Sequence, residues 1–250
     1  MMMVMAFAQT KQRIDEYVKD KLWYWHLPLW LFGLYIFVML LGFDLTKPLP
    51  FVVQIPHAFD FMLHEVSHIV TGWLPALLTA AAGSGSELLL GALFVWGAFR
   101  FGNYFATLFC CLWLMLACMS VGAYMADAVP QQIPLVSLGA ALSGSDAATH
   151  DWHFIFGQLG MLGASGFIGG AFKVVGILVG LFGLSFSAWV MYKMGAAADA
   201  RPAMTKEDLA QLKASVNSKE APTKAVYPTP LKGALAEHGP SKPSKDASGR

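Results

Sequence analysis

Charged side chains are scarce in this chain of 250 residues, and their scarcity excludes an ordinary soluble fold. Asp, Glu, Lys and Arg make up 13% of the residues and hydrophobic residues 56%, whereas a soluble domain has about 25% charged residues. Only Lys47, Arg100 and Lys173 provide positive charge between Leu22 and Tyr192. This composition predicts an integral membrane protein that lies in a lipid bilayer.

Cysteine and histidine are also few. The three cysteines, Cys110, Cys111 and Cys118, fall in one apolar run and are expected to pack there rather than to form a disulfide framework. Seven histidines are too few for the repeated histidine boxes of a di-iron lipid hydroxylase or desaturase. No stripe of basic and aromatic residues is present, so nucleic acid is not an expected partner.

The apolar runs predict an all-α fold, a polytopic bundle of about six membrane-spanning helices. Five runs approach the length of about 20 residues that a helix needs to cross a bilayer. The third, at 88–99, is shorter and either extends back through the Gly/Ser stretch 83–87 or is re-entrant. In chain order the expected spans are residues 22–43, 51–80, 88–99, 104–128, 152–170 and 172–194.

The predicted spans divide the chain into three parts. Residues 1–21 are expected to form a cytoplasmic N-terminal segment, 22–195 a membrane-embedded domain, and 196–250 a mostly disordered polar tail. Lys and Arg concentrate at both ends of the chain. Because positive charge favours the cytoplasmic side, both termini are expected in the cytoplasm.

The second span contains an H-E-x-x-H motif at residues 64–68. His64 and His68 share one face of a helix, so both imidazoles can bind one zinc ion. Glu65 projects in another direction, from which it can act on a water molecule as general base. Ionisable groups in an apolar span need compensation, which a metal supplies. The motif therefore predicts a Zn²⁺-dependent hydrolase whose site lies within the membrane.

A zinc ion held by two histidines needs a third protein ligand. Asp151, which begins a later apolar segment, ranks first among the candidates. His150 and His153 are alternatives, because imidazole is also a good zinc ligand. Glu87 is a fourth candidate, ranked lower because Pro75 and the Gly/Ser stretch separate it from the motif.

Two further polar residues precede the motif on the same helix face. Asp60 is four residues before His64, from where it can hydrogen-bond an imidazole of the pair. His57 lies nearer the expected membrane surface and is interpreted as an interfacial residue.

The motif in an early span and Asp151 at the start of a later one resemble the site-2 protease family of intramembrane zinc metalloproteases, especially its small bacterial single-domain members. The resemblance covers roughly residues 51–193. It implies a zinc held by His64, His68 and Asp151, with Glu65 as general base. It also implies cleavage of a membrane-spanning protein segment and a location in a bacterial inner membrane.

The chain differs from the family pattern in two respects. Family members commonly have Leu-Asp-Gly at the aspartate, where this chain has His150-Asp151-Trp152. No inserted periplasmic recognition domain is present. The alternative function is a non-catalytic metal-binding membrane scaffold or complex subunit, whose Lys- and Pro-rich tail would bind the partner.

Overall fold

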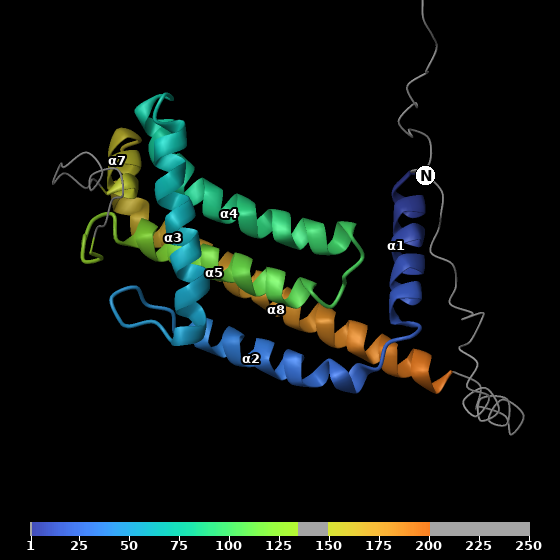
Figure 1. Cartoon of the computed structure of the whole chain (residues 1–250). Coiled ribbons are helices and arrows are strands. Elements are labelled where there is room, and N and C mark those ends of the chain that lie inside the picture. Colours follow the sequence, from blue (N-terminus) through green and yellow to red (C-terminus); the bar gives the residue numbers. More distant parts are fainter. Residues whose placement is uncertain (1, 135–149, 201–250) are drawn as a thin grey trace, which may run out of the picture. The chain divides into compact units, whose positions relative to one another are not determined.

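The computed structural model describes residues 2–134 and 150–200, and every regular element in these ranges is a helix (Figure 1). The all-α prediction is confirmed for this part of the chain. The tail predicted to be mostly disordered, 196–250, begins inside the last helix, which runs to Asp199. Residues 201–250 and most of the loop before Asp151 lie outside the described residues. The elements are α1 (Met2–Val18), η1 (Trp23–Trp25), α2 (Leu27–Leu41), α3 (Phe51–Thr71), α4 (Ala76–Arg100), α5 (Thr107–Ala126), α7 (Asp151–Gln158), η2 (Leu162–Ala164) and α8 (Ser165–Asp199).

Three helices within the described ranges are long and apolar enough to cross a membrane, as a membrane protein requires. They are α4, α5 and the η2–α8 segment Leu162–Asp199. α2 is as apolar but has only 15 residues, and α3 has 21 residues but is less apolar. The predicted number of six spans is therefore not confirmed.

The second and third predicted spans have different boundaries in the structure. α3 ends at Thr71, and Pro75 precedes a new helix, α4, that runs without interruption to Arg100. Thus the short run 88–99 does extend back through the Gly/Ser stretch rather than forming a re-entrant segment. The stretch stays helical because its small residues pack closely: Gly83 lies against His64, and Ser84 accepts a hydrogen bond from Trp152.

The last two predicted spans also differ. The chain forms the 8-residue helix α7 and then turns at Gly160, whose φ of 67° favours glycine. The break expected near residue 171 does not occur, since α8 continues through it for 35 residues. Its glycines are used for close helix packing: Gly176 and Gly183 lie against α5.

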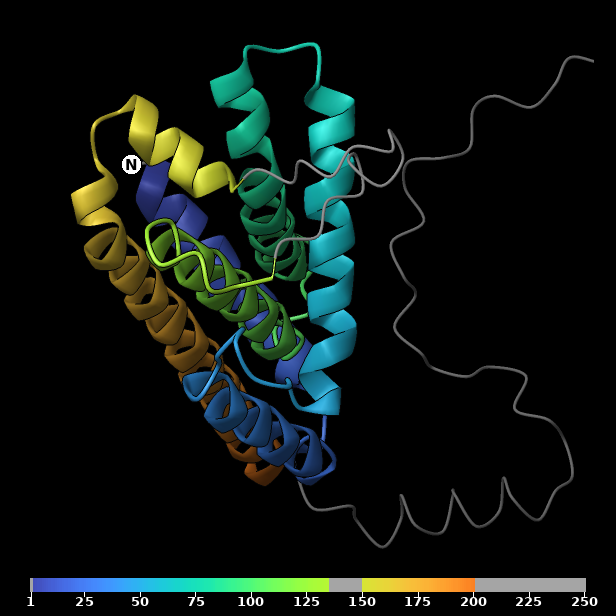
Figure 2. The ribbon, with the colours of Figure 1, turned by 90° about the vertical axis from the view of Figure 1, so that its left-hand side faces the viewer.

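The central helix is α5, most of whose side chains are buried. α5 packs most extensively on α8 and also contacts α2, α3, α4 and α7. α2, α4, α5 and α8 run alongside one another, and α3 crosses them steeply near the end of the bundle where α7 lies (Figures 1 and 2). This arrangement brings the C-terminal half of α3, the start of α4 and the end of α5 close to α7.

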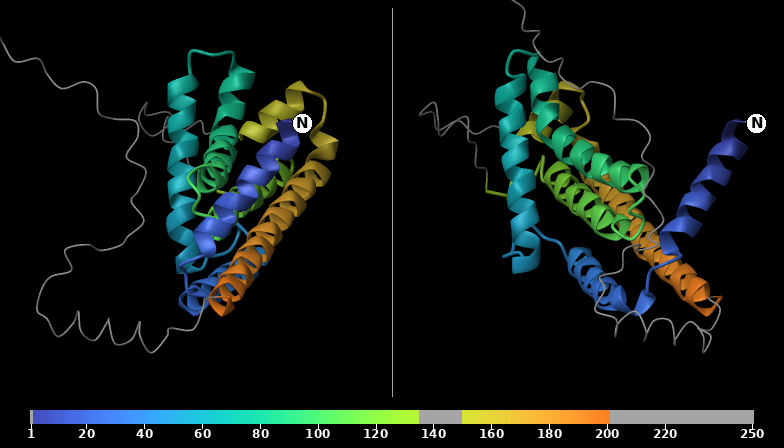
Figure 3. Two further views of the ribbon diagram at one scale, coloured as in Figure 1. Left: turned by 90° about the vertical axis from the view of Figure 1, so that its right-hand side faces the viewer. Right: turned by 45° about the vertical axis from the view of Figure 1, so that its right-hand side comes forward.

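α1 packs at the opposite end of the bundle from α7 (Figure 3). Ile14 and Val18 are buried against Tyr104, Val190 and Met194. The N-terminal segment is thus attached to the helices through its apolar face.

The turn between α2 and α3 is closed by local polar contacts. The Asp44 carboxylate accepts hydrogen bonds from the Thr46 backbone N–H at 3.0 Å and hydroxyl at 2.7 Å, and it lies 2.9 Å from Lys47 Nζ. The hydrogen bonds from Thr46 and Lys47 lower the pKa of Asp44 to about 2. The Asp44 carboxylate therefore stays ionised to a lower pH than an ordinary aspartate does.

Close packing of α5 on α8 makes a first prediction. A Cβ on Gly122 would lie 2.6 Å from the Gly169 carbonyl oxygen, so Gly122→Ala forces the two backbones apart. We expect Gly122→Ala to lower the free energy of unfolding by about 1–3 kcal/mol, measured by thermal unfolding in detergent. Gly170→Ala, whose Cβ would meet nothing within 4 Å, is the control and should not destabilise. Equal behaviour of the two variants would contradict the packing argument.

Candidate metal centre

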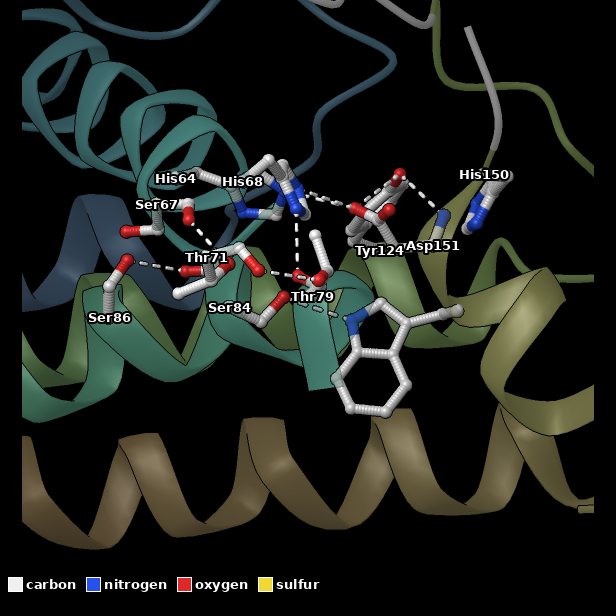
Figure 4. A network of polar contacts seen from close by, with 12 residues as sticks. His64, Ser67, His68, Thr71, Thr79, Ser84, Ser86, Tyr124, His150 and Asp151 are labelled. Atoms are coloured by element: carbon white, nitrogen blue, oxygen red, sulfur yellow. Dashed lines mark hydrogen bonds and ion pairs between the residues drawn. The ribbon is translucent and has the colours of Figure 1, made fainter. Parts of the chain in front are cut away.

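Two side chains of α3 converge with one side chain of α7, which is distant in the sequence. His64 and His68 lie one turn apart on α3, and Asp151 is the first residue of α7. The Asp151 Oδ2 atom is 3.1 Å from Nε2 of His64 and 3.1 Å from Nε2 of His68 (Figure 4). His64 is buried, and the other two are partly buried. The structure thus brings together the three residues that the sequence predicted as ligands.

The other nitrogen of each imidazole is also fixed. His64 Nδ1 lies 2.6 Å from Glu87 Oε1, and His68 Nδ1 lies 2.9 Å from the Thr79 carbonyl oxygen. A backbone carbonyl can only accept hydrogen bonds, so His68 Nδ1 donates to Thr79. His64 Nδ1 donates in the same way when the Glu87 carboxylate is ionised. In neutral imidazoles both Nε2 atoms therefore carry lone pairs. Metal-binding histidines typically have this arrangement, in which the second nitrogen donates to a carboxylate or a carbonyl.

Three electron-rich atoms consequently face one another in a largely buried place. Two imidazole lone pairs and a carboxylate oxygen repel unless a positive charge is shared between them, either protons on Nε2 or a metal cation. The three ligand atoms lie within 4.8 Å of one another, so the group could hold a metal ion. Ligand atoms about 2.1 Å from a tetrahedral zinc are about 3.4 Å apart, close to the 3.1 Å separations observed.

α4 holds the two imidazoles in place. The Thr79 hydroxyl donates to the Thr71 carbonyl at 2.8 Å, which ties the start of α4 to the end of α3. One turn further, Gly83 leaves room for the His64 ring, because a Cβ there would lie 2.6 Å from Nε2. Glu87 follows after another turn and reaches His64 Nδ1. Thr79, Gly83 and Glu87, spaced four residues apart, therefore form one face of α4 directed at the histidine pair.

α7 is held in position by hydrogen bonds to two parts of the bundle. Trp152 Nε1 donates to Ser84 Oγ of α4 at 3.0 Å, and His153 Nδ1 lies 2.7 Å from the Ala128 carbonyl oxygen just after α5. The helix begins with an N-cap, in which His150 Nδ1 accepts the His153 backbone N–H. These contacts fix α7 against the bundle.

A cavity of about 270 Å³ adjoins His64, the first histidine of the motif. Glu65 is 6% exposed and lines this cavity together with His64. Polar groups of Glu87, Ser120 and Tyr124 and apolar side chains share the wall; the apolar members are Leu45, Phe61, Val121, Ile133 and Pro134. The predicted base therefore lines a space that also reaches His64, one of the three candidate metal ligands. That space could admit water and part of a small or extended ligand.

The alternative third ligands have other partners in the structure. His150 caps α7 and its Nε2 lies 3.5 Å from Asp127 Oδ2, while His153 is bound to Ala128. Glu87 lies on the Nδ1 side of His64 and not with the converging Nε2 atoms. Asp151 is thus the candidate that joins the two histidines in the described part of the chain.

Asp60 was predicted to hydrogen-bond an imidazole of the pair, but Glu87 makes this contact instead. Asp60 is fully buried and accepts a hydrogen bond from Trp113 Nε1 of α5 at 2.8 Å, and no contact with an imidazole is found for it among the described residues. The partner of Asp60 comes from α5 and that of His64 from α4, although both residues lie on one side of α3. His57 packs against Phe43 and lines the cavity rather than lying only at a surface.

Sequence reasoning missed the roles of Thr79, Gly83 and Tyr124. Thr79 acts through its backbone carbonyl and Gly83 through the absence of a side chain, so neither has a residue-type signal. Tyr124 lies within the apolar run 104–128, so nothing in the sequence marks it as a site residue. The four-residue spacing of Thr79, Gly83 and Glu87 is the one signal that could have indicated a polar face on α4.

Comparison with known proteins adds no assignment: no family model, curated protein or solved structure matches this chain.

The close approach of Gly83 to His64 makes a second prediction. Gly83→Ala should push the His64 ring out of position and weaken metal binding. Gly85→Ala, two residues away and with nothing within 4 Å of its Cβ, should bind metal as wild type does. Zinc titration of both purified variants tests this difference, and equal affinities would show that the His64 position does not matter for metal binding.

Proposed function

We propose that this protein is a zinc-dependent intramembrane metalloprotease that hydrolyses a peptide bond in or near a membrane-spanning segment of another protein. One observation carries the proposal: the two Nε2 atoms of the H-E-x-x-H motif converge with Asp151 while both Nδ1 atoms are held by acceptors. This is the donor set of a catalytic zinc site with three protein ligands and one open position. His64, His68 and Asp151 would hold the ion.

Zinc, when bound, lowers the pKa of a coordinated water toward about 7 and polarises a carbonyl. Glu65 then accepts a proton from the attacking water and returns it to the leaving amine. Glu87 and the Thr79 carbonyl keep the imidazoles oriented and increase their basicity. The cavity beside Glu65 receives the residues that flank the scissile bond.

The membrane setting indicates the kind of substrate. Three helices of this chain are long and apolar enough to cross a bilayer, so the nearest polypeptides are other membrane-spanning segments. A helical segment shields its carbonyls, because each is already hydrogen-bonded within the helix. The substrate must therefore be locally extended where it enters the cavity.

The proposed topology makes a third prediction. Positive charge before Leu22 and after Tyr192 places both termini in the cytoplasm, which requires an even number of crossings. Fusions of a reporter that is active only in the cytoplasm should therefore be active at both ends. A fusion after Lys47, in the turn that follows α2, should be inactive. Termini on opposite sides would contradict this topology and with it the even number of spans.

The role of Glu65 makes a fourth prediction. Glu65→Gln should keep about one zinc per chain but lower the cleavage rate of membrane-spanning reporter proteins by a factor of about 10²–10⁴, because the general base is lost. His64→Ala, the matched change at a ligand, should lose the zinc as well. Metal analysis and reporter cleavage are measured on the same purified proteins.

The outcomes separate the two functions that the sequence left open. If Glu65→Gln retains full cellular function while His64→Ala does not, the protein acts as a metal-binding scaffold and the protease proposal falls. If neither His64→Ala nor His68→Ala changes the zinc content, the assignment of these residues as zinc ligands is wrong.

A further inference from the structure

Tyr124 contacts the third candidate ligand at two points. Its hydroxyl lies 3.2 Å from the Asp151 backbone nitrogen and 3.5 Å from Asp151 Oδ2 (Figure 4). The backbone N–H can only donate, so the hydroxyl accepts from it and directs its own hydrogen toward the carboxylate. One side chain of α5 thus holds both the main chain and the side chain of Asp151.

The Tyr124 ring is fixed on two sides. It stacks on the His150 imidazole with a centroid distance of 4.2 Å and an interplanar angle of 27°. It also meets the His64 ring edge to face at 5.9 Å. The phenol therefore lies between a motif histidine of α3 and the residue that precedes Asp151 in α7.

α7 has few other means of directing Asp151. It has only 8 residues, and its hydrogen bonds from Trp152 and His153 fix the helix rather than the carboxylate. Asp151 Oδ2 is the atom that both Nε2 atoms face. A hydrogen bond to this atom from a rigid ring selects the orientation of the carboxylate before any metal binds.

We propose that Tyr124 is the positioning residue that presents Asp151 to the metal, so that metal affinity depends on its hydroxyl. This inference deepens the proposed function, since it rests on the His64–His68–Asp151 metal site, but it does not require proteolysis. Hydrogen-bond partners of metal ligands typically change metal affinity by 10–100-fold when they are removed.

The test replaces the hydroxyl and keeps the ring. Tyr124→Phe retains the stacking on His150 and removes both contacts with Asp151. We expect its dissociation constant for Zn²⁺ to rise by about 10–100-fold and the visible d–d spectrum of the Co²⁺-loaded protein to change. Circular dichroism and thermal unfolding without metal show whether the variant folds as wild type does.

Tyr104→Phe is the matched control. Tyr104 is 1% exposed on the same bundle, and its hydroxyl has no hydrogen-bond partner in the described part of the chain. Removing that hydroxyl should leave both the Zn²⁺ affinity and the Co²⁺ spectrum unchanged.

A double-mutant cycle with Asp151→Ala separates positioning from general packing. If Tyr124 acts through Asp151, adding Tyr124→Phe to Asp151→Ala weakens Zn²⁺ binding by no more than about twofold. Equal losses in both backgrounds, or a Tyr124→Phe affinity within about twofold of wild type, would overturn the inference while leaving the protease proposal intact. A large non-additive loss in a protein that cleaves nothing would support the inference and overturn proteolysis instead.

Discussion

The site depends on one electrostatic constraint: two imidazole nitrogens and a carboxylate oxygen share a largely buried place and all face inward. Such a group is unfavourable in apolar surroundings unless a shared positive charge compensates it. The partners on the far side of each ring make the constraint stricter, because a neutral imidazole that donates from Nδ1 presents its Nε2 lone pair to the other two groups. Metal binding and the orientation of the rings are therefore one property of the site, set by α4 and α7 as much as by α3.

Small residues make this convergence possible. Gly83 allows α4 to pass against the face of His64, and Gly122 and Gly169 allow α5 and α8 to approach backbone to backbone. Without an aqueous driving force between helices in lipid, such close approach is a main source of packing energy. Near residue 171, where a break between two spans was predicted, Gly169 instead packs against Gly122 within a continuous α8.

The sequence predicted local features well and relations between helices less well. The spacing of His64 and His68 fixes their common face, so this pair could be found without a structure. Asp151 ranked first among four candidates for a third ligand, and its contacts with both Nε2 atoms were found only in the structure. That Glu87 rather than Asp60 reaches an imidazole could not be predicted, since both are carboxylates near the motif and only the packing of α4 and α5 decides between them. The number of spans could not be predicted either, because glycine-rich apolar runs fit both one long helix and two short ones.

α3 shows how a helix with polar residues can lie in an apolar protein. Its exposed residues include Phe59, Met62 and Val66, whereas Asp60, His64 and Glu65 are buried. Polar groups in membrane proteins turn toward the protein interior or a cavity for the same energetic reason. Because α3 crosses the other helices instead of running alongside them, its polar face can meet α4, α5 and α7 at once. That crossing gives one short motif access to acceptors from two separate elements, α4 and α7, and it explains why a site of this kind needs distant parts of the chain to be complete.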